Sequence, residues 1–174
     1  MVLAKNLRKE MTTLLKTKHF LGIAVCACCF FFSSCENEEA YHKFQDVKQS
    51  LWSKNDSLCF IIDTTDIRPG VAYDIQIETV NNSLFPYQNL WLFVRSNVDA
   101  ERIFRQDTMQ IQLADVYGKW TGSGFGAYYQ NAILFRKRVV FPMKRKYTFQ
   151  VIQGMRDEPL AGIEKIGLKI SRSK

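Results

Sequence analysis

One cysteine of this sequence stands at the boundary between an apolar run and an acidic cluster. The 13 residues of 20–32 are apolar, two serines follow, and Cys35 then precedes Glu36, Glu38 and Glu39. A thiol at such a boundary suits covalent attachment of fatty acid, because each buried methylene contributes ~0.8 kcal/mol and two acyl chains hold a protein stably on a bilayer. The residues around this cysteine therefore indicate how the chain is delivered and held.

The tetrapeptide Phe32-Ser33-Ser34-Cys35 resembles the lipobox of bacterial lipoproteins. We predict that residues 1–34 are a lipoprotein signal peptide, that Cys35 is diacylated on sulfur, and that cleavage makes it the first residue. The apolar run is short of the ~20 residues that cross a bilayer. An ordinary signal peptide cleaved elsewhere and an uncleaved anchor are the alternatives. Basic residues precede the run at Lys5, Arg8, Lys9, Lys16 and Lys18.

The other cysteines predict no disulfide. Cys26, Cys28 and Cys29 lie in the predicted leader, which leaves Cys59 without a partner once Cys35 carries lipid. Cys59 belongs to the strand-like segment LCFIID, so we expect it to be a small buried apolar group.

The charge balance gives little reason to expect a nucleic-acid partner. The leader holds five Lys/Arg and one Glu, so its removal lowers the net charge from +7 to +3. We expect a location in the cell envelope, lipid-anchored in the outer membrane, with the periplasmic or surface side left open. Residues 36, 38 and 39 resemble the acidic export signals of some surface lipoproteins, and a plain solvated tether is the alternative.

The remaining chain is divided into a tether and one domain. Residues 35–57 are polar, and we predict a lipidated tether and a segment that leads into the fold. Residues 58–174 show apolar side chains with a period of two, as in 71–80, 108–114 and 147–153, whereas 90–96 is apolar on both faces. Turn residues separate these runs. We therefore predict an all-β fold, an antiparallel β-sandwich of immunoglobulin-like or jelly-roll-like type with 7–8 strands.

Residues for enzyme chemistry are scarce. Both histidines, His19 and His42, precede the predicted domain, so we expect no histidine-based triad or zinc site there. The glycine-rich segment 122–126 precedes a strand-like run rather than a helix, which argues against a phosphate loop. We predict no enzyme activity, no metal, no small-molecule substrate and no cofactor beyond the lipid on Cys35. Three pairs of carboxylates could in principle serve a glycosidase site or bind calcium, but each lies in or beside a predicted turn, so we expect them to form turns. The pairs are Asp63 with Asp66, Asp107 with Asp115, and Asp157 with Glu158.

Three segments together resemble the gliding-motility lipoprotein family GldH: 85–94, 107–126 and 155–170. The resemblance covers nearly the whole chain after Cys35. It implies a non-catalytic accessory or scaffold protein of the envelope, associated with the gliding and type IX secretion machinery, with other envelope lipoproteins or motility proteins as partners. Because the family includes proteins of non-gliding bacteria, motility itself does not follow from it.

Four residues in the matching segments are predicted to act together. Asp115, Lys119 and Arg156 have no obvious role in core packing, and with Trp120 we expect a partner-facing or loop-bracing cluster. The alternative function is a surface glycan-binding module, because aromatic residues near the glycine-rich segment would offer flat surfaces to sugars. Exposed aromatic side chains in a row would favour glycan binding, and burial of both Trp91 and Trp120 would favour the scaffold.

Overall fold

The computed structural model describes residues 39–174, which form antiparallel β-sheets and contain no α-helix. Within this range, no helix is long and apolar enough to cross a membrane. The elements are β1 (Glu39–Asp46), η1 (Lys48–Ser50), β2 (Leu51–Trp52), β3 (Leu58–Ile62), β4 (Ala72–Asn82), β5 (Asn89–Ala100), β6 (Ile103–Gln112), β7 (Ser123–Phe125), β8 (Tyr128–Val140), β9 (Tyr147–Gln153), β10 (Leu160–Ala161) and β11 (Ile163–Arg172).

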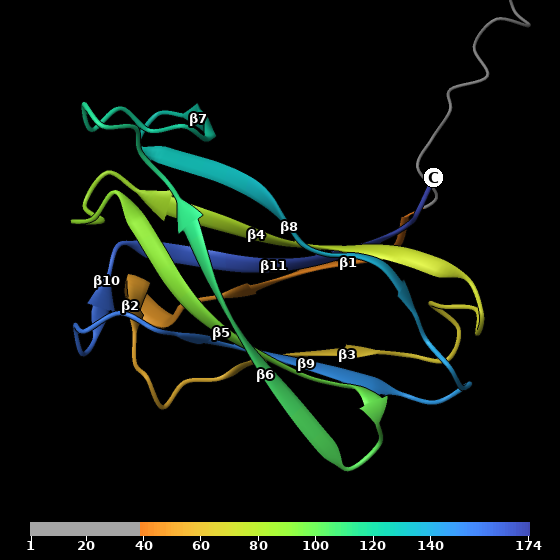
Figure 1. The fold of residues 1–174 in the computed structure, drawn as a ribbon. Helices are drawn as coiled ribbons and strands as arrows, with labels where there is room; N and C mark the ends of the chain where they lie inside the picture. The colour runs from red at the N-terminus through yellow and green to blue at the C-terminus, as the bar shows by residue number, and fades with distance from the viewer. Residues whose placement is uncertain (1–38) are drawn as a thin grey trace, which may run out of the picture. The chain divides into compact units, whose positions relative to one another are not determined.

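Two sheets pack face to face as a β-sandwich (Figure 1). The larger sheet has the order β1-β11-β4-β8-β7, and the second has the order β3-β9-β5-β6. A small third sheet pairs β10 with β2. The predicted fold class is confirmed, and the 11 strands exceed the predicted number because β1, β2, β7 and β10 carry too few apolar positions to show a period.

The strands form because alternate side chains can enter one core. Along β4, Tyr73, Ile75 and Ile77 are buried, and along β9 every second residue from Tyr147 to Gln153 is buried. The strand β5 contributes Leu92 and Val94 from the opposite sheet. Each fully buried side chain of this size stabilises the fold by about 1.5–3 kcal/mol.

The folded domain begins earlier than predicted. Residues 39–46 form β1, which hydrogen-bonds along β11, and Trp52 is 1% exposed in the core. The predicted domain start at residue 58 is therefore too late, because much of the predicted tether belongs to the sandwich. The error arose because β1 is an edge strand whose attachment comes from backbone hydrogen bonds, and only Tyr41 among its residues is buried.

Two further expectations are corrected. Cys59 is exposed rather than buried, because β3 alternates and turns its even-numbered residues inward. The segment 90–96 lies inside its sheet between β9 and β6, but only one of its faces is buried, and Trp91 on the other face is 39% exposed.

Strand direction separates the loops into two groups. The terminus end holds the start of β1, the end of β11 and the connections β3–β4, β5–β6 and β8–β9. The distal end holds the connections β4–β5, β6–β7, β7–β8 and β9–β10. Figure 1 shows the C-terminus beside the start of β1, with β7 on the opposite side.

Candidate functional site

Asp115 braces the connection between β6 and β7 at the distal end. Its Oδ1 accepts hydrogen bonds from the backbone N–H groups of Tyr117 and Lys119, both at 2.9 Å. Its own N–H donates to the carbonyl of Lys119 at 2.8 Å. Gly118 completes this tight turn with a φ of +82°, a conformation that glycine adopts without strain. The carboxylate therefore satisfies backbone donors that would otherwise face solvent.

The braced connection presents apolar side chains to solvent. Val116 is 82% exposed and Tyr117 is 92% exposed, and the Lys119 side chain is exposed beside them. Trp120 is half-buried and fastens the connection to the body of the sandwich: its ring lies 5.5 Å from that of Tyr129. A backbone bridge between Ala114 and Trp120 closes the base of this connection.

The adjoining β7–β8 hairpin ends in further exposed aromatic residues. Phe125 is 93% exposed and Tyr128 is 53% exposed. A Cβ atom on Gly124 would lie 2.7 Å from the Tyr129 ring, so glycine is needed for β7 to run this close to β8. A shallow hollow of about 410 Å³ lies beside the hairpin, lined in part by Phe125, Tyr128 and Tyr129. We call Val116, Tyr117, Phe125 and Tyr128 the distal aromatic patch.

Arg156 lies at the same end but in another connection, between β9 and β10. Its side chain is exposed, and its carbonyl accepts a hydrogen bond from Lys54 Nζ at 3.0 Å. Within residues 39–174, Asp115 and Arg156 share no hydrogen bond or ion pair. The structure therefore places Asp115, Lys119 and Trp120 in one connection and Arg156 in its neighbour.

Aromatic contacts link these two connections. The Trp120 ring lies 6.4 Å from that of Phe85, which lies 5.9 Å from the ring of Tyr87. The Tyr87 hydroxyl donates to Asp157 at 2.8 Å, and this hydrogen bond raises the pKa of Tyr87. The pKa of Glu158 is lowered, first by a hydrogen bond from the Ser53 hydroxyl and then by the N–H of Lys54. The carboxylates here hold loops together.

The outer face of the larger sheet holds a buried carboxylate that the sequence did not predict. Glu78 is 4% exposed, and its Oε2 lies 3.1 Å from His42 Nε2 and 3.2 Å from Gln130 Nε2. The other ring nitrogen of His42 lies 3.2 Å from Glu39. The expectation that the folded domain lacks histidine is wrong, because His42 belongs to β1. Only the sheet order, in which β1 and β4 lie on either side of β11, could have revealed this contact.

The paired carboxylates make structural contacts. Asp66 accepts from the N–H of Asp63 at 2.7 Å, and Asp107 pairs with Arg136 of β8 rather than with Asp115. Within residues 39–174, no group of three or more histidine, cysteine or acidic residues is arranged to hold a metal ion. Cys35 lies outside the described residues.

The outer face of the second sheet carries a different set of exposed groups. Trp91 and Phe93 are two residues apart on β5 and point to the same side. A hollow of about 640 Å³ lies on this side, lined in part by Phe93, Arg95 and Gln106. Trp91 is therefore not buried, and Trp120 is buried only in part.

Comparison with known proteins agrees with the resemblance seen in the sequence. A family described as GldH lipoprotein matches residues 39–170. The gliding motility lipoprotein GldH homolog of Christiangramia forsetii is 27% identical over 149 residues, covering 82% of this chain and 89% of that protein. The gliding motility lipoprotein GldH of Flavobacterium johnsoniae is 25% identical over 158 residues, covering 87% and 95%.

Among solved structures, the coat protein of Tobacco streak virus aligns with 76% of this chain and 87% of its own at 10% identity, with a TM-score of 0.25. A score this low does not establish a shared fold. The family match spans most of the chain, from the first strand to the last. This chain belongs to the GldH lipoprotein family.

Proposed function

We propose that this chain is a non-catalytic accessory protein of the cell envelope, held on a membrane by lipid on Cys35 and working through protein contacts at its distal end. Both relatives named above carry the name gliding motility lipoprotein. A place in the gliding and type IX secretion machinery is the finer part of this proposal. The partners are other envelope lipoproteins or proteins of that machinery.

The distal aromatic patch carries the proposal. The Tyr117 and Phe125 rings are more than 90% exposed, and aromatic side chains are enriched at protein interfaces. The patch is also presented on a rigid support, because Asp115 and Trp120 brace one connection and a short two-stranded hairpin holds the other. A braced backbone has less conformational entropy to lose when a partner binds.

The test is affinity recovery of the lipidated protein from detergent-solubilised envelopes. We expect the double variant Phe125→Ser and Tyr128→Ser to lose the co-purifying chains that the natural protein retains. Ile103→Ser is the matched control, because Ile103 is an equally apolar residue, 64% exposed, at the terminus end. An unchanged set of co-purifying chains in the double variant would contradict the proposal.

Glycan binding is the second candidate, and the outer face of the second sheet favours it. Trp91 and Phe93 offer ring faces beside polar groups of Arg95 and Gln106, the combination that sugars bind. Migration of the protein through gels that contain envelope polysaccharide measures this interaction. If this candidate holds, the polysaccharide retards the natural protein and Trp91→Ala abolishes the retardation. Equal migration with and without polysaccharide would exclude it.

A further inference from the structure

We propose that the terminus end docks on anionic lipid headgroups of the bilayer to which Cys35 tethers the chain. The docking surface is a basic rim, defined as Arg68, Lys137, Arg138 and Lys144. The inference rests on the proposed function, because lipid on Cys35 is what brings this end to a membrane.

The length of the tether decides which end meets the bilayer. Cys35 precedes Glu39, the first residue of β1, by four residues. Four residues span at most about 14 Å when fully extended. The start of β1 lies at the terminus end, so lipid on Cys35 holds this end close to the headgroups and leaves the distal aromatic patch facing away.

The loops that carry the basic rim are joined to one another. The N–H of Gly70 in the β3–β4 connection donates to the carbonyl of Phe141 in the β8–β9 connection at 3.3 Å. Lys146 of the β8–β9 connection pairs with Asp63 of the β3–β4 connection at 3.6 Å. These contacts hold against each other the two connections that carry Arg68 and Lys144.

A bulge near the end of β8 exposes the two residues that β8 contributes to the basic rim. The register between β4 and β8 shifts on either side of Ile75, and Arg138 has a φ of +55°. The N–H of Arg138 donates to Asp74 of β4 at 2.9 Å, which fixes the irregular backbone. Bulges of this kind redirect side chains away from the regular ladder. Lys137 and Arg138 are exposed as a result.

Three acidic side chains at the terminus end, Glu39, Asp63 and Asp74, are engaged in contacts, and Glu101 in the β5–β6 connection is not. Within residues 39–174, the four side chains of the rim form no hydrogen bond or ion pair. Glu39 pairs with Lys169 at 2.8 Å, and Asp63 pairs with Lys146. Asp74 accepts hydrogen bonds from the Ser173 hydroxyl and from the backbone of Arg138. Besides the Ser173 hydrogen bond, the charges of Lys137 and Arg138 contribute to the lowered pKa of Asp74, and the four cations of the rim outnumber this one carboxylate, which leaves positive charge to meet phosphate.

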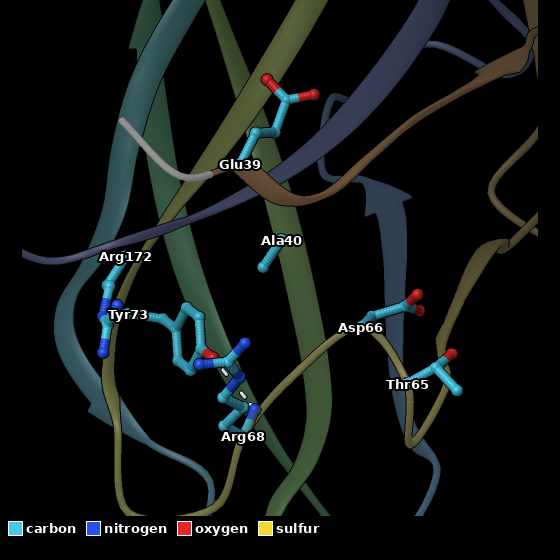
Figure 2. A pocket seen from close by; sticks show the side chains of 7 residues that line it. All are labelled: Glu39, Ala40, Thr65, Asp66, Arg68, Tyr73 and Arg172. Carbon is cyan, nitrogen blue, oxygen red and sulfur yellow. Dashed lines mark hydrogen bonds between the residues drawn. The ribbon is translucent and has the colours of Figure 1, made fainter. Parts of the chain in front are cut away.

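A small hollow beside the rim is lined by side chains of both charges. It encloses about 250 Å³, and its lining includes Arg68, Arg172 and Tyr73 together with the carboxylates Glu39 and Asp66. Figure 2 shows the two guanidinium groups flanking the Tyr73 ring, with the carboxylates of Glu39 and Asp66 turned away from it. Guanidinium groups are the preferred partners of phosphate oxygens in proteins. Tyr73 holds the backbone of Arg68 by accepting its N–H at 2.9 Å.

The test uses the protein isolated from its native membranes and reconstituted into vesicles of phosphatidylcholine, with or without anionic phosphatidylglycerol. Acylation rates of individual lysines are measured by mass spectrometry. We expect labelling of Lys137 and Lys144 to slow about fivefold on the anionic vesicles, as one cation near a charged bilayer implies. Lys48 and Lys119 serve as internal controls, because Lys48 follows the distal end of β1 and Lys119 lies in the β6–β7 connection. The protection should disappear at 1 M salt, where the Debye length is about 3 Å.

A charge variant separates a general electrostatic effect from docking of the rim. Arg68→Gln with Arg138→Gln should abolish most of the protection, whereas Arg95→Gln with Arg156→Gln removes the same charge elsewhere and should leave it intact. Equal labelling on neutral and anionic vesicles would overturn the inference and favour an acidic protein as the partner of the rim.

The same vesicles show separately whether the proposed function fails. Release of the protein from both kinds of vesicle at 1 M salt would mean that Cys35 carries no anchor. Protection of Lys137 and Lys144 at low salt would still report on the rim in that case.

Discussion

Among single residues, Asp115 offers the clearest separation of bracing from partner binding. We expect Asp115→Ala to lower the free energy of unfolding by about 1 kcal/mol, because two backbone N–H groups lose their acceptor. Urea denaturation measures this change. The neighbouring Lys119→Ala should stay within about 0.5 kcal/mol of the natural protein, since its side chain is exposed. An equal loss in both variants would contradict the bracing role.

The pair of Glu39 and Lys169 predicts how acid affects stability. A hydrogen bond from Lys169 lowers the pKa of Glu39 below 4.5, and the same bond raises the pKa of Lys169 above 10.5. The ionised carboxylate is therefore favoured by folding, so its contribution is present above pH 4.5 and is lost as the pH falls through the lowered pKa. The cation loses its contribution only when the pH rises through its raised pKa.

We therefore expect Glu39→Gln to be less stable than the natural protein at pH 7, with a difference that shrinks as the pH falls below 4.5. Thermal unfolding across this range measures it. Glu101→Gln is the control, because Glu101 is exposed and its carboxylate makes no contact within residues 39–174. A difference that persists at low pH would contradict the role of the ion pair.

At the level of elements, two glycines distinguish a packing requirement from a backbone requirement. Gly162 between β10 and β11 has a φ of +90°, and an added Cβ would lie 2.5 Å from the backbone of Phe85. Gly118 has a φ of +82° but no atom within 4 Å of such a Cβ. We expect Gly118→Ala to be destabilising by about 1–2 kcal/mol. Gly162→Ala should be destabilising by more than about 3 kcal/mol, or should prevent folding.

Urea midpoints of the two glycine variants provide the comparison. Equal losses would mean that the approach of Phe85 to the β10–β11 junction does not constrain the fold. A larger loss for Gly162→Ala would show that this junction fixes the β4–β5 connection, from which the aromatic contacts reach Trp120.

The elements also show how far the sequence could predict this fold. Strands with a clean period of two, such as β4 and β9, were predictable because one face of each enters the core. The strand β1 was not, because it is attached through the backbone ladder of β11 and buries few side chains. Cys59 was misplaced because an apolar run does not reveal that only one face of β3 is buried.

The sequence predicted the candidate site only in part. The connection that holds Asp115, Lys119 and Trp120 was predictable as a unit, because these residues are near neighbours in the chain. The position of Arg156 depends on how β9 and β10 pack at the distal end, and that depends on contacts through Phe85 and Tyr87. Distances between segments so far apart in sequence arise only from tertiary packing. Whether the four residues serve a partner stays a prediction.

At the scale of the whole molecule, the two ends of the sandwich have different proposed functions: one contacts the membrane and the other contacts a partner. The terminus end carries the start of β1, the C-terminus and the basic rim, and the distal end carries the distal aromatic patch. A short tether at one end and apolar rings at the other suit a protein that stands on a membrane and contacts a partner above it. The proposed arrangement depends on one thioether bond, between a diacylglyceryl group and the sulfur of Cys35.

Intact-mass spectrometry of the protein isolated from its native membranes tests that bond most directly. The account predicts a chain that begins at Cys35 and carries two acyl chains on a thioether-linked glycerol, commonly with a third on the amine. A chain with a bare thiol at this position, or one that keeps residues 1–34, would contradict it.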